Sequence, residues 1–464
     1  MKAKEGMTMA KNPARLVIIG SGSGGLPVAS ALKRQGADYD ITVFTRDTDI
    51  AYSQCGIPFV LGGEIASFGD LLMEEMAHYT KMGIEIRTGV EVTRIDTHNN
   101  RIFVGSEEVG YDFLVIATGT TQSAPVIEGR ELIGVFPAHT KTLGDARGLG
   151  EYLKSHDIRN AVILGSGSVD LEMALACLKG GMKVTVVGSR HHLLPDWLDA
   201  EMADIVRKHL EGLGIRVITG KLVNRIEGDA KNERVESVNL GDESIEAEVV
   251  FTGTSFKPDV KLAVEDGIEV TEHGIVIDET CRVKKKGRIL PNVFASGACT
   301  HTINLVTGKP DFFFQASSSI KKSKVIADRL LGRASILKPQ VNPKVTVLGG
   351  LHIGSVGITS QKAAEHGIGV IAGEALGIST SRYYPGAKPI YMKLLFDAES
   401  NILIGGQVIS PERGVKERID ALGMAICCGV SLEELAGFET SYSPPVAHLI
   451  DVMTEAAQNI KRQQ

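Results

Sequence analysis

Cys55 is the residue of this chain whose setting best suits redox chemistry. It follows a strand-like segment and precedes Gly-Ile-Pro and an apolar stretch. A thiolate is the species that attacks disulfide sulfur, and no second cysteine lies near Cys55 in the sequence. We therefore expect oxidised Cys55 to be a mixed disulfide, a persulfide or a sulfenic acid. For Cys299 both a packing and a chemical role stay open, and buried packing is expected for Cys177, Cys281, Cys427 and Cys428.

The composition is that of a globular protein with several domains. The chain has 464 residues, enough for about three domains. Apolar residues make up 43% and charged residues 23%, which are ordinary values for a soluble protein. The net charge of −6 provides no basic field, so we expect no nucleic-acid partner.

Neither a metal nor a membrane is expected. The six cysteines show no CxxC pair and no ladder of ligand spacing, which argues against a metal site and a secreted disulfide framework. A reducing cytoplasm is therefore the expected location. No apolar run reaches the ~18–20 residues that cross a bilayer. The first thirteen residues are polar and lack the apolar core of a signal peptide, so a disordered tail is expected.

A glycine-rich turn near the N-terminus has the pattern of a nucleotide site. Gly20 allows a sharp turn, Gly22 lets the backbone approach a pyrophosphate, and Gly25 lets helix and strand pack closely. The N-terminus of the following helix adds a positive dipole for the phosphates. The flanking segments are predicted as a strand, a helix and a second strand, at Leu16–Ile19, Leu26–Arg34 and Ile41–Phe44.

The same pattern returns 145 positions later and indicates a second nucleotide-binding unit. Gly165 and Gly167 take the first two glycine positions, but Asp170 stands at the third. Its side chain and its negative charge should both weaken the binding of a dianionic ligand. The surrounding elements are predicted as a strand at Ala161–Leu164, a helix as far as Leu178 and a strand at Lys183–Val187.

The residues after the second strand of each unit bear on the choice of cofactor. A carboxylate there usually holds a ribose, but the first unit has Thr45, followed by Arg46. The second unit has Ser189, Arg190 and His191 at this place. Because Arg and His can pair with a 2′-phosphate, the second turn favours NADPH over NADH.

Further strand-to-glycine turns indicate that the second unit is inserted into the first. They lie in Tyr111–Thr120, Glu248–Asp259 and Asn292–Thr300. We predict an α/β protein with two Rossmann-like nucleotide-binding domains, the second inserted in the first. The expected bounds are 14–150 together with 270–335 for the first domain and 151–269 for the second.

Residues 340–464 are predicted to form a separate α+β domain. The preceding stretch, 334–345, holds two prolines and little periodicity, as is typical of a linker. Beyond it, strand-like runs alternate with helical ones, at Ile390–Phe396, Ile402–Val408, Gly414–Cys428 and Leu432–Ala436.

Together these pieces resemble the pyridine nucleotide-disulfide oxidoreductases, and within them the branch with a single redox cysteine. That branch includes coenzyme A-disulfide reductases, persulfide and polysulfide reductases, and NADH oxidases and peroxidases. The resemblance implies FAD in the first domain, NAD(P)H in the inserted domain, and a homodimer formed through the C-terminal domain. It runs from about residue 14 to 457, and its most specific segments are SQCGIPFVLGG (Ser53–Gly63), YDFLVIATG (Tyr111–Gly119), RYYPGAKPIYMKLLFD (Arg382–Asp397) and SYSPPVAHLID (Ser441–Asp451).

The resemblance also implies which residues hold the cofactors. Two positions depart from the family pattern, which usually has Glu at Thr45 and Asp at Ala298. Each lost charge-assisted hydrogen bond costs ~1.5–3 kcal/mol, which would loosen FAD without abolishing its binding. The implied FAD contacts are Gly20, Ser21, Gly22, Gly25, Thr45, Arg46, Thr118, Gly119, Gly297 and Ala298, and the nicotinamide cofactor contacts are Gly165, Gly167, Glu172, Ser189, Arg190 and His191.

The family pattern sharpens the chemistry expected of Cys55. Val60, five residues on, stands where a dithiol enzyme has its second cysteine. The family cysteine sits at a helix start, which should lower the pKa of the thiol. Family oxidases and peroxidases carry a His in the first glycine turn, where this chain has only Ser21 and Ser23. Reduction of peroxide is therefore disfavoured relative to reduction of sulfur.

Three residues farther along complete the implied site. Tyr442 matches a tyrosine that, in coenzyme A-disulfide reductases, reaches the cysteine from the second subunit and could protonate a leaving thiolate. Arg34 matches a contact to a coenzyme A phosphate, and Lys388 adds positive charge nearby. A packing role for Tyr442 and a solvated position for Arg34 stay open as alternatives.

The expected function is NAD(P)H-dependent reduction of a low-molecular-weight disulfide, persulfide or polysulfide, through FAD and Cys55. A coenzyme A-derived compound is one candidate substrate. An NADH oxidase or peroxidase is the first alternative. The second is a degenerate, non-catalytic dimer that binds a nucleotide, which the changes at Asp170, Thr45 and Ala298 motivate.

Overall fold

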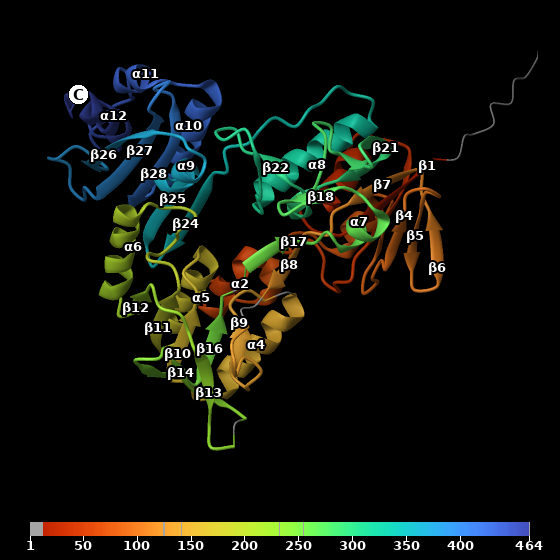
Figure 1. Cartoon of the computed structure of the whole chain (residues 1–464), viewed down its shortest axis with the longest axis horizontal. Helices are drawn as coiled ribbons and strands as arrows, with labels where there is room; N and C mark the ends of the chain where they lie inside the picture. Colours follow the sequence, from red (N-terminus) through yellow and green to blue (C-terminus); the bar gives the residue numbers. More distant parts are fainter. Residues whose placement is uncertain (1–12, 124–125, 141, 232, 254, 464) are drawn as a thin grey trace, which may run out of the picture.

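The computed structural model describes residues 13–463, apart from 124–125, 141, 232 and 254. The expected N-terminal tail lies almost wholly outside the described residues. The chain forms three lobes in Figure 1: a red and orange lobe that also has green and teal segments, a yellow and green lobe, and a mainly blue C-terminal lobe. We call them the first, second and C-terminal lobes.

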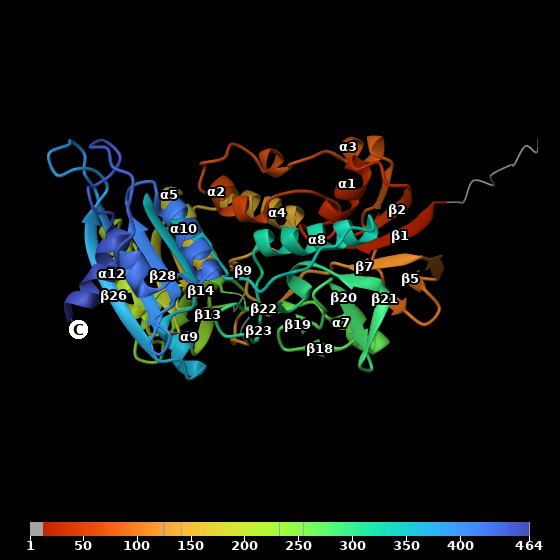
Figure 2. The ribbon, with the colours of Figure 1, turned by 90° about the horizontal axis from the view of Figure 1, so that it is seen from above.

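The first lobe is built on a six-stranded sheet that the chain enters twice. Its order is β20–β21–β7–β1–β2–β3, and every neighbouring pair except β20–β21 is parallel. Helices α1 and α8 lie against each other over this sheet (Figure 2). The bounds are β1 Ala14–Ile19, β2 Tyr39–Phe44, β3 Ile84–Arg87, β7 Phe113–Ile116, β20 Arg282–Lys285, β21 Arg288–Ala295, α1 Leu26–Arg34 and α8 Ala316–Leu330.

The second lobe holds a five-stranded, wholly parallel sheet in the order β12–β11–β10–β16–β9. Its strands are rich in Val and Ile, as expected of parallel strands covered on both faces. Helices α4, α5 and α6 belong to this lobe. The bounds are β9 Val135–Pro137, α4 Leu143–Ser155, β10 Asn160–Leu164, α5 Ser168–Lys179, β11 Lys183–Gly188, α6 Ala200–Gly212, β12 Arg216–Thr219 and β16 Val249–Thr252.

The second sheet differs from the expected bounds of 151–269. Strand β9 pairs with β16 although it precedes residue 151. Strand β17, Ser255–Pro258, pairs with β8, Thr120–Ser123, and not with this sheet. The helix that follows, α7 at Lys261–Asp266, contacts β4 of the first lobe, Arg94–Asp96. We therefore propose that the inserted unit begins before β9 and ends before β17.

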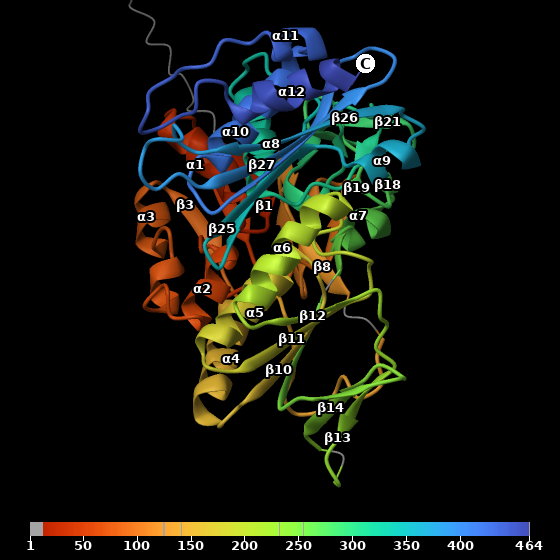
Figure 3. The ribbon, with the colours of Figure 1, turned by 90° about the vertical axis from the view of Figure 1, so that its left-hand side faces the viewer.

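The C-terminal lobe is a five-stranded antiparallel sheet, β24–β25–β28–β27–β26, with α10 and α12 packed on it. Strand β24 starts at Lys344, inside the segment expected to be a linker. Figure 3 shows α6 lying between this sheet and the strands of the second lobe. The bounds are β24 Lys344–Leu348, β25 Leu351–Gly357, α9 Ser360–Glu365, β26 Val370–Ile378, β27 Pro389–Asp397, β28 Leu403–Ser410, α10 Val415–Cys428, α11 Leu432–Ala436 and α12 Val452–Gln463.

All six cysteines are free thiols. Cys177, Cys281 and Cys299 are buried, but Cys427 and Cys428 are exposed at the end of α10. The expectation of burial was wrong for these two because they follow the last buried residue of the helix and face outward. In the part of the chain that the structure describes, no helix is long and apolar enough to cross a bilayer, and no group of three or more His, Cys, Asp or Glu could hold a metal.

Candidate active site

Cys55 lies in a single turn that leads straight into a short helix. The turn is Gln54–Gly56, and helix α2 follows at Ile57–Leu61. Gly56 packs closely here, because a Cβ at this position would lie 2.3 Å from Cδ2 of Leu71, whose side chain would have to shift. The Cys55 side chain is exposed. The thiol is therefore carried on closely packed backbone and has a face open to a substrate.

The pKa of the Cys55 thiol is raised from its ordinary value. Desolvation is the largest cause of the shift. The Glu172 carboxylate raises the pKa further, and a backbone hydrogen bond opposes both effects. The expected lowering was wrong, because desolvation and a nearby negative charge outweigh the dipole of a helix of only 5 residues.

Glu172 approaches Cys55 from the second lobe. It lies on α5, which packs against α2. The hydroxyl of Thr346 donates to Oε1 of Glu172 at 2.7 Å. Burial raises the pKa of Glu172, and the bond from Thr346 acts in the opposite direction. Glu172, which was predicted to contact the nicotinamide cofactor, is thus fixed by the C-terminal lobe and acts electrostatically on Cys55.

The first glycine turn fits the pyrophosphate of a dinucleotide. A Cβ on Gly20 would lie 2.1 Å from O of Ala117, and one on Gly25 would lie 2.0 Å from O of Gly20. Both positions therefore require glycine. A Cβ on Gly22 would meet nothing within 4 Å, and the same holds at Gly119. The backbone at these two glycines is open to a ligand, as FAD binding requires.

Other residues that the resemblance implies for FAD binding form hydrogen bonds or ion pairs within the protein. The Ser21 hydroxyl donates to Oγ1 of Thr45 at 3.1 Å, and both side chains are buried. The Thr118 hydroxyl donates to O of Asp259 at 2.6 Å. Arg46 Nη2 lies 3.9 Å from Oδ2 of the same Asp259. Asp259 thus links Thr118 and Arg46 to the segment in which the chain returns from the second lobe to the first.

The turn after β21 closes against the first glycine turn. A Cβ on Gly24 would lie 2.9 Å from Cα of Gly297. Ala298 follows Gly297 and brings no carboxylate to this turn.

A buried lysine holds the same turn from α8. Lys322 is fully buried, and its Nζ donates to Oγ1 of Thr300 at 2.7 Å and to the carbonyl oxygens of Gly297 and Thr300 at 3.3 and 3.4 Å. Burial lowers the pKa of Lys322 to about 8. Sequence reasoning missed this lysine, because no motif marks it within α8.

In the second glycine turn, the carboxylate of Asp170 already accepts a hydrogen bond from one backbone N–H group. The N–H of Gly167 donates to Oδ2 of Asp170 at 2.9 Å. The carboxylate fills the space beside Gly165, where a Cβ would lie 2.3 Å from Oδ2. Burial raises the pKa of Asp170 to about 6. The turn keeps the shape of a dinucleotide site, but one of its N–H groups is bound internally.

The side chains expected at a 2′-phosphate are accessible. Ser189, Arg190 and His191 are all exposed. The backbone of this turn is fixed, because the N–H of Gly220 donates to O of Arg190 at 2.8 Å. Ordered backbone with exposed cationic side chains suits recognition of a phosphate group.

Tyr442 belongs to a cluster of hydroxyl groups in the C-terminal lobe. Its Oη lies 2.9 Å from Oη of Tyr383 and 3.1 Å from Oγ of Ser381. Hydrogen bonds with Ser381 and then Tyr383 lower the pKa of Tyr442, whose side chain is exposed. Within the described parts of one chain, no contact joins Tyr442 to Cys55. Sequence reasoning missed Ser381 and Tyr383, although Tyr383 stands in the RYYPG motif.

The two implied substrate residues remain available to solvent. Arg34 is exposed at the last residue of α1, and Lys388 is exposed just before β27. The backbone N–H of Lys388 donates to Oγ of Ser379 at 3.0 Å, which fixes the end of the loop that carries Tyr383. The structure brings neither side chain into contact with Cys55 among the described residues of one chain.

Comparison with known proteins identifies the architecture. Residues 14–319 match the family described as pyridine nucleotide-disulphide oxidoreductase, and residues 343–453 match its dimerisation domain. The chain belongs to this family. The NADH oxidase of Methanocaldococcus jannaschii is 35% identical over 451 residues, covering 96% of this chain and 98% of that protein. The NAD(P)H sulfur oxidoreductase (CoA-dependent) of Pyrococcus furiosus is 30% identical over 456 residues, covering 96% and 99%.

A solved structure in the family agrees over nearly the whole chain. The NAD-dependent persulfide reductase from A. fulgidus has a TM-score of 0.91 at 29% identity, covering 97% of this chain and 83% of that one. The expected fold, with nucleotide-binding lobes and a dimerisation domain, is confirmed. The protein is a flavin-dependent oxidoreductase that uses a nicotinamide cofactor, as its family implies.

Proposed function

We propose that this enzyme uses NAD(P)H to reduce a low-molecular-weight disulfide, persulfide or polysulfide through the single thiol of Cys55. The observation that carries the proposal is an exposed thiol beside Glu172, with Val60 where a second cysteine would stand. The names of two similar proteins, a CoA-dependent sulfur oxidoreductase and a persulfide reductase, support sulfur as the substrate element. A coenzyme A-derived compound is the proposed disulfide or persulfide.

The sulfur steps balance without a second cysteine. The Cys55 thiolate attacks one sulfur of the substrate, so that a mixed disulfide forms and one thiolate leaves. Two electrons then break the mixed disulfide, which returns the Cys55 thiolate and releases the second half of the substrate. FAD, when bound, supplies these two electrons after taking a hydride from the nicotinamide cofactor. With a persulfide, attack on the outer sulfur expels the thiolate and leaves a persulfide on Cys55, which the two electrons convert to the Cys55 thiolate and hydrogen sulfide.

The protein groups around the sulfur set its protonation. Because Glu172 and desolvation disfavour the thiolate, Cys55 rests as the thiol and must lose its proton before it attacks the substrate. In the proposed homodimer, Tyr442 acts from the second subunit and protonates the leaving thiolate. The hydrogen bonds that lower its pKa make the phenol a better proton donor. Arg34 and Lys388 would supply positive charge for the phosphates of a coenzyme A substrate.

Anaerobic turnover tests the proposal. Coenzyme A disulfide and inorganic polysulfide are each assayed with NADPH and NADH. Cys55→Ser is expected to reduce turnover to background, since serine cannot form the mixed disulfide. Cys427→Ser is the matched control, because Cys427 is also exposed but lies on α10, and its activity should equal that of the wild type. Unchanged turnover in Cys55→Ser would rule the proposal out.

An NADH oxidase is the second candidate, favoured by the name of the Methanocaldococcus jannaschii relative. The serines of the first glycine turn argue against peroxide chemistry, since neither can act as the base that a histidine provides. Oxygen uptake with NADH alone decides between the two. A rate that rivals disulfide reduction would favour the oxidase. The non-catalytic alternative is set aside, because the chain matches enzymes over its whole length.

Two further assignments belong to the proposal. NADPH is slightly preferred over NADH, on account of the exposed Arg190 and His191. The active unit is a homodimer formed through the C-terminal lobe, and its mass in solution is measurable by light scattering. The cytoplasmic location expected from the cysteine pattern stays a prediction.

A further inference from the structure

One face of strand β24 contacts three separate parts of the second lobe. Side chains two residues apart on a strand point to the same side, and here these are Lys344, Thr346 and Leu348. The alternate residues, Val345 and Val347, are exposed. The face that looks toward the second lobe is therefore the one that carries the polar contacts. It contacts the segment after Arg190, helix α5 and helix α6.

Lys344 holds the segment that follows the proposed 2′-phosphate turn. Its Nζ donates to O of Asp196 at 2.6 Å and lies 5.9 Å from the centroid of the Trp197 ring. Burial lowers the pKa of Lys344 to about 8. Because a backbone carbonyl accepts along a defined direction, this hydrogen bond restrains the backbone at Asp196 and does more than place a positive charge nearby.

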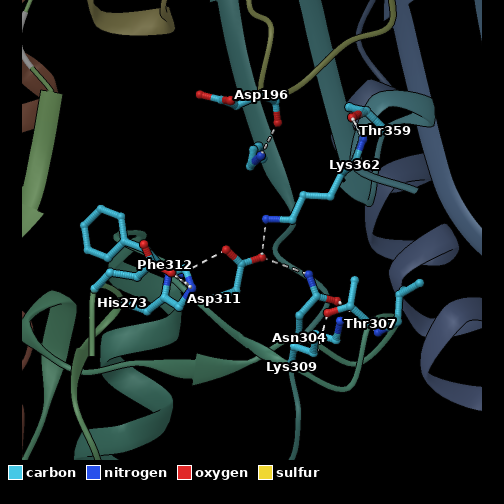
Figure 4. A network of polar contacts seen from close by, with 12 residues as sticks. Asp196, His273, Asn304, Thr307, Lys309, Asp311, Phe312, Thr359 and Lys362 are labelled. Carbon is cyan, nitrogen blue, oxygen red and sulfur yellow. Dashed lines mark hydrogen bonds and ion pairs between the residues drawn. The ribbon is translucent and has the colours of Figure 1, made fainter. Parts of the chain in front are cut away.

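The surroundings of this contact are themselves tied to the first lobe. Figure 4 shows Asp196 on one side and Lys362 reaching Asp311 on the other. Lys362 Nζ lies 2.8 Å from Oδ2 of Asp311, which also accepts from Nδ2 of Asn304 at 3.1 Å. The C-terminal lobe thus meets both nucleotide lobes at one junction.

The same segment is fixed a second time at Asp199, where α6 is about to begin. The N–H of Asp199 donates to Oε1 of Gln407 at 2.8 Å. Its carboxylate accepts from the N–H and the hydroxyl of Ser360 at 2.9 and 2.6 Å, and pairs with Lys393 at 2.9 Å. Asp199 is buried, as is Lys393. Every one of these partners belongs to the C-terminal lobe.

Farther along the strand, the side chain of Thr346 contacts α5, and the backbone at Leu348 and Gly349 contacts α6. The Thr346 hydroxyl holds Glu172 of α5. Nε2 of His209, on α6, lies 3.0 Å from the carbonyl oxygens of Leu348 and Gly349. The second lobe therefore contacts β24 through residues that precede Arg190 in the sequence, on α5, and through residues that follow it, at Asp196 and on α6.

We propose that strand β24 positions the nicotinamide cofactor site, with Lys344 acting through the segment from Arg190 to Asp199 and Thr346 acting through Glu172. This inference rests on the proposed function, because it takes the second lobe as the nicotinamide site. Both residues are positioning residues and do not touch the cofactor. The physical reason is that the contact at Asp196 restrains the middle of the segment, between the bonds at Arg190 and those at Asp199, and so preserves its order on the side that meets the ligand.

The test measures cofactor affinity and local order together. Lys344→Met removes the donor and keeps the length of the side chain, and Lys338→Met, an exposed lysine of the preceding segment, is the control. The chain has 1 tryptophan, Trp197, so nucleotide binding to the FAD-loaded protein is followed by its fluorescence. Lys344→Met is expected to weaken NADPH binding about fivefold or more and to speed amide hydrogen exchange in 190–199, with kcat unchanged at saturating cofactor.

Thr346→Val supplies an independent arm that keeps the shape of the side chain. It is expected to weaken NADPH binding and to shift the pH profile of Cys55 alkylation, and Thr346→Ser should restore both. Wild-type nucleotide affinity in both Lys344→Met and Thr346→Val overturns the inference, even if exchange in 190–199 becomes faster. A wild-type protein that binds neither NADPH nor NADH would instead sink the proposed function, and this inference with it.

Discussion

The Glu172 carboxylate raises the pKa of the Cys55 thiol, although the two residues belong to different lobes. The turn with Cys55 leads into α2, and α2 packs against α5, which carries Glu172. A negative charge at this place disfavours the thiolate form of Cys55. The lone thiol is therefore guarded electrostatically rather than by a second cysteine.

Removing that charge is expected to make Cys55 more reactive. In Glu172→Gln the pKa of the Cys55 thiol should fall, because a negative charge that disfavours the thiolate is gone. Alkylation by iodoacetamide at pH 7 should become severalfold faster, and the midpoint of its pH profile should move to lower pH. Glu64→Gln is the control, since Glu64 lies just beyond α2 and pairs with Lys179 of α5. A midpoint that is unchanged or higher would contradict the prediction.

Asp170 is expected to make the second lobe less stable as pH rises. Its folded pKa of about 6 lies above the ~3.9 of an unfolded aspartate. Below pH ~4 both states are protonated and burial carries no penalty. Between pH ~4 and ~6 the unfolded chain ionises first, so the free energy of unfolding falls by up to roughly 3 kcal/mol and is then constant.

Denaturant unfolding from pH 4.5 to 7.5 checks the Asp170 prediction. Asp170→Asn should flatten the pH dependence, since the amide can still accept from Gly167 but carries no charge. Asp145→Asn is a close control, because Asp145 occupies the same capping position at the start of α4 but is exposed. Equal slopes for the wild type and Asp170→Asn would show that Asp170 is not the titrating group.

Restoring an acid at Ala298 is expected to tighten FAD binding. An aspartate there can accept a hydrogen bond from the ribityl chain, and a bond of this charge-assisted kind is worth about tenfold or more in affinity. The dissociation constant of FAD is measured on protein stripped of flavin and reloaded. Ala298→Ser is the control for size. If Ala298→Asp binds FAD more weakly than the wild type, a carboxylate at this turn does not contribute to FAD binding.

Arg190→Ala is expected to act on NADPH alone. Loss of the guanidinium should weaken NADPH binding by roughly tenfold and leave NADH unchanged, because only NADPH carries a 2′-phosphate. Arg216→Ala is the control, an arginine of β12 in the same sheet that pairs with Glu243. Equal losses for both nucleotides, or none, would remove the assignment of this turn to a 2′-phosphate.

Local patterns in the sequence predicted local structure well. The helices at Leu26–Arg34 and Leu432–Ala436 lie where they were predicted, because a glycine turn with Pro27 starts the first and a capping serine starts the second. The boundary at residue 151 was not predictable in the same way. Strand β9 has only 3 residues, and it is recognisable only by its pairing with β16 more than a hundred residues later.

The electrostatics of the site escaped sequence reasoning for the same physical reason. The raised pKa of Cys55 depends on Glu172, which folding brings from another lobe. The bond from Thr346 that holds Glu172 spans 174 positions. Asp170 is a different case: a glycine followed three residues later by an aspartate at a helix start is a local capping pattern, so its inward turn could have been predicted.

The first sheet takes its strands from two separate parts of the chain, and this affects the order in which the lobes can fold during synthesis. Strand β7 pairs with β21, whose last residue is Ala295, so the first sheet stays incomplete until nearly three hundred residues have left the ribosome. The second lobe is contiguous, and one of its hydrophobic clusters is built from its own residues, so that part can form earlier. Until then the outer edge of β7 is an open template for other strands.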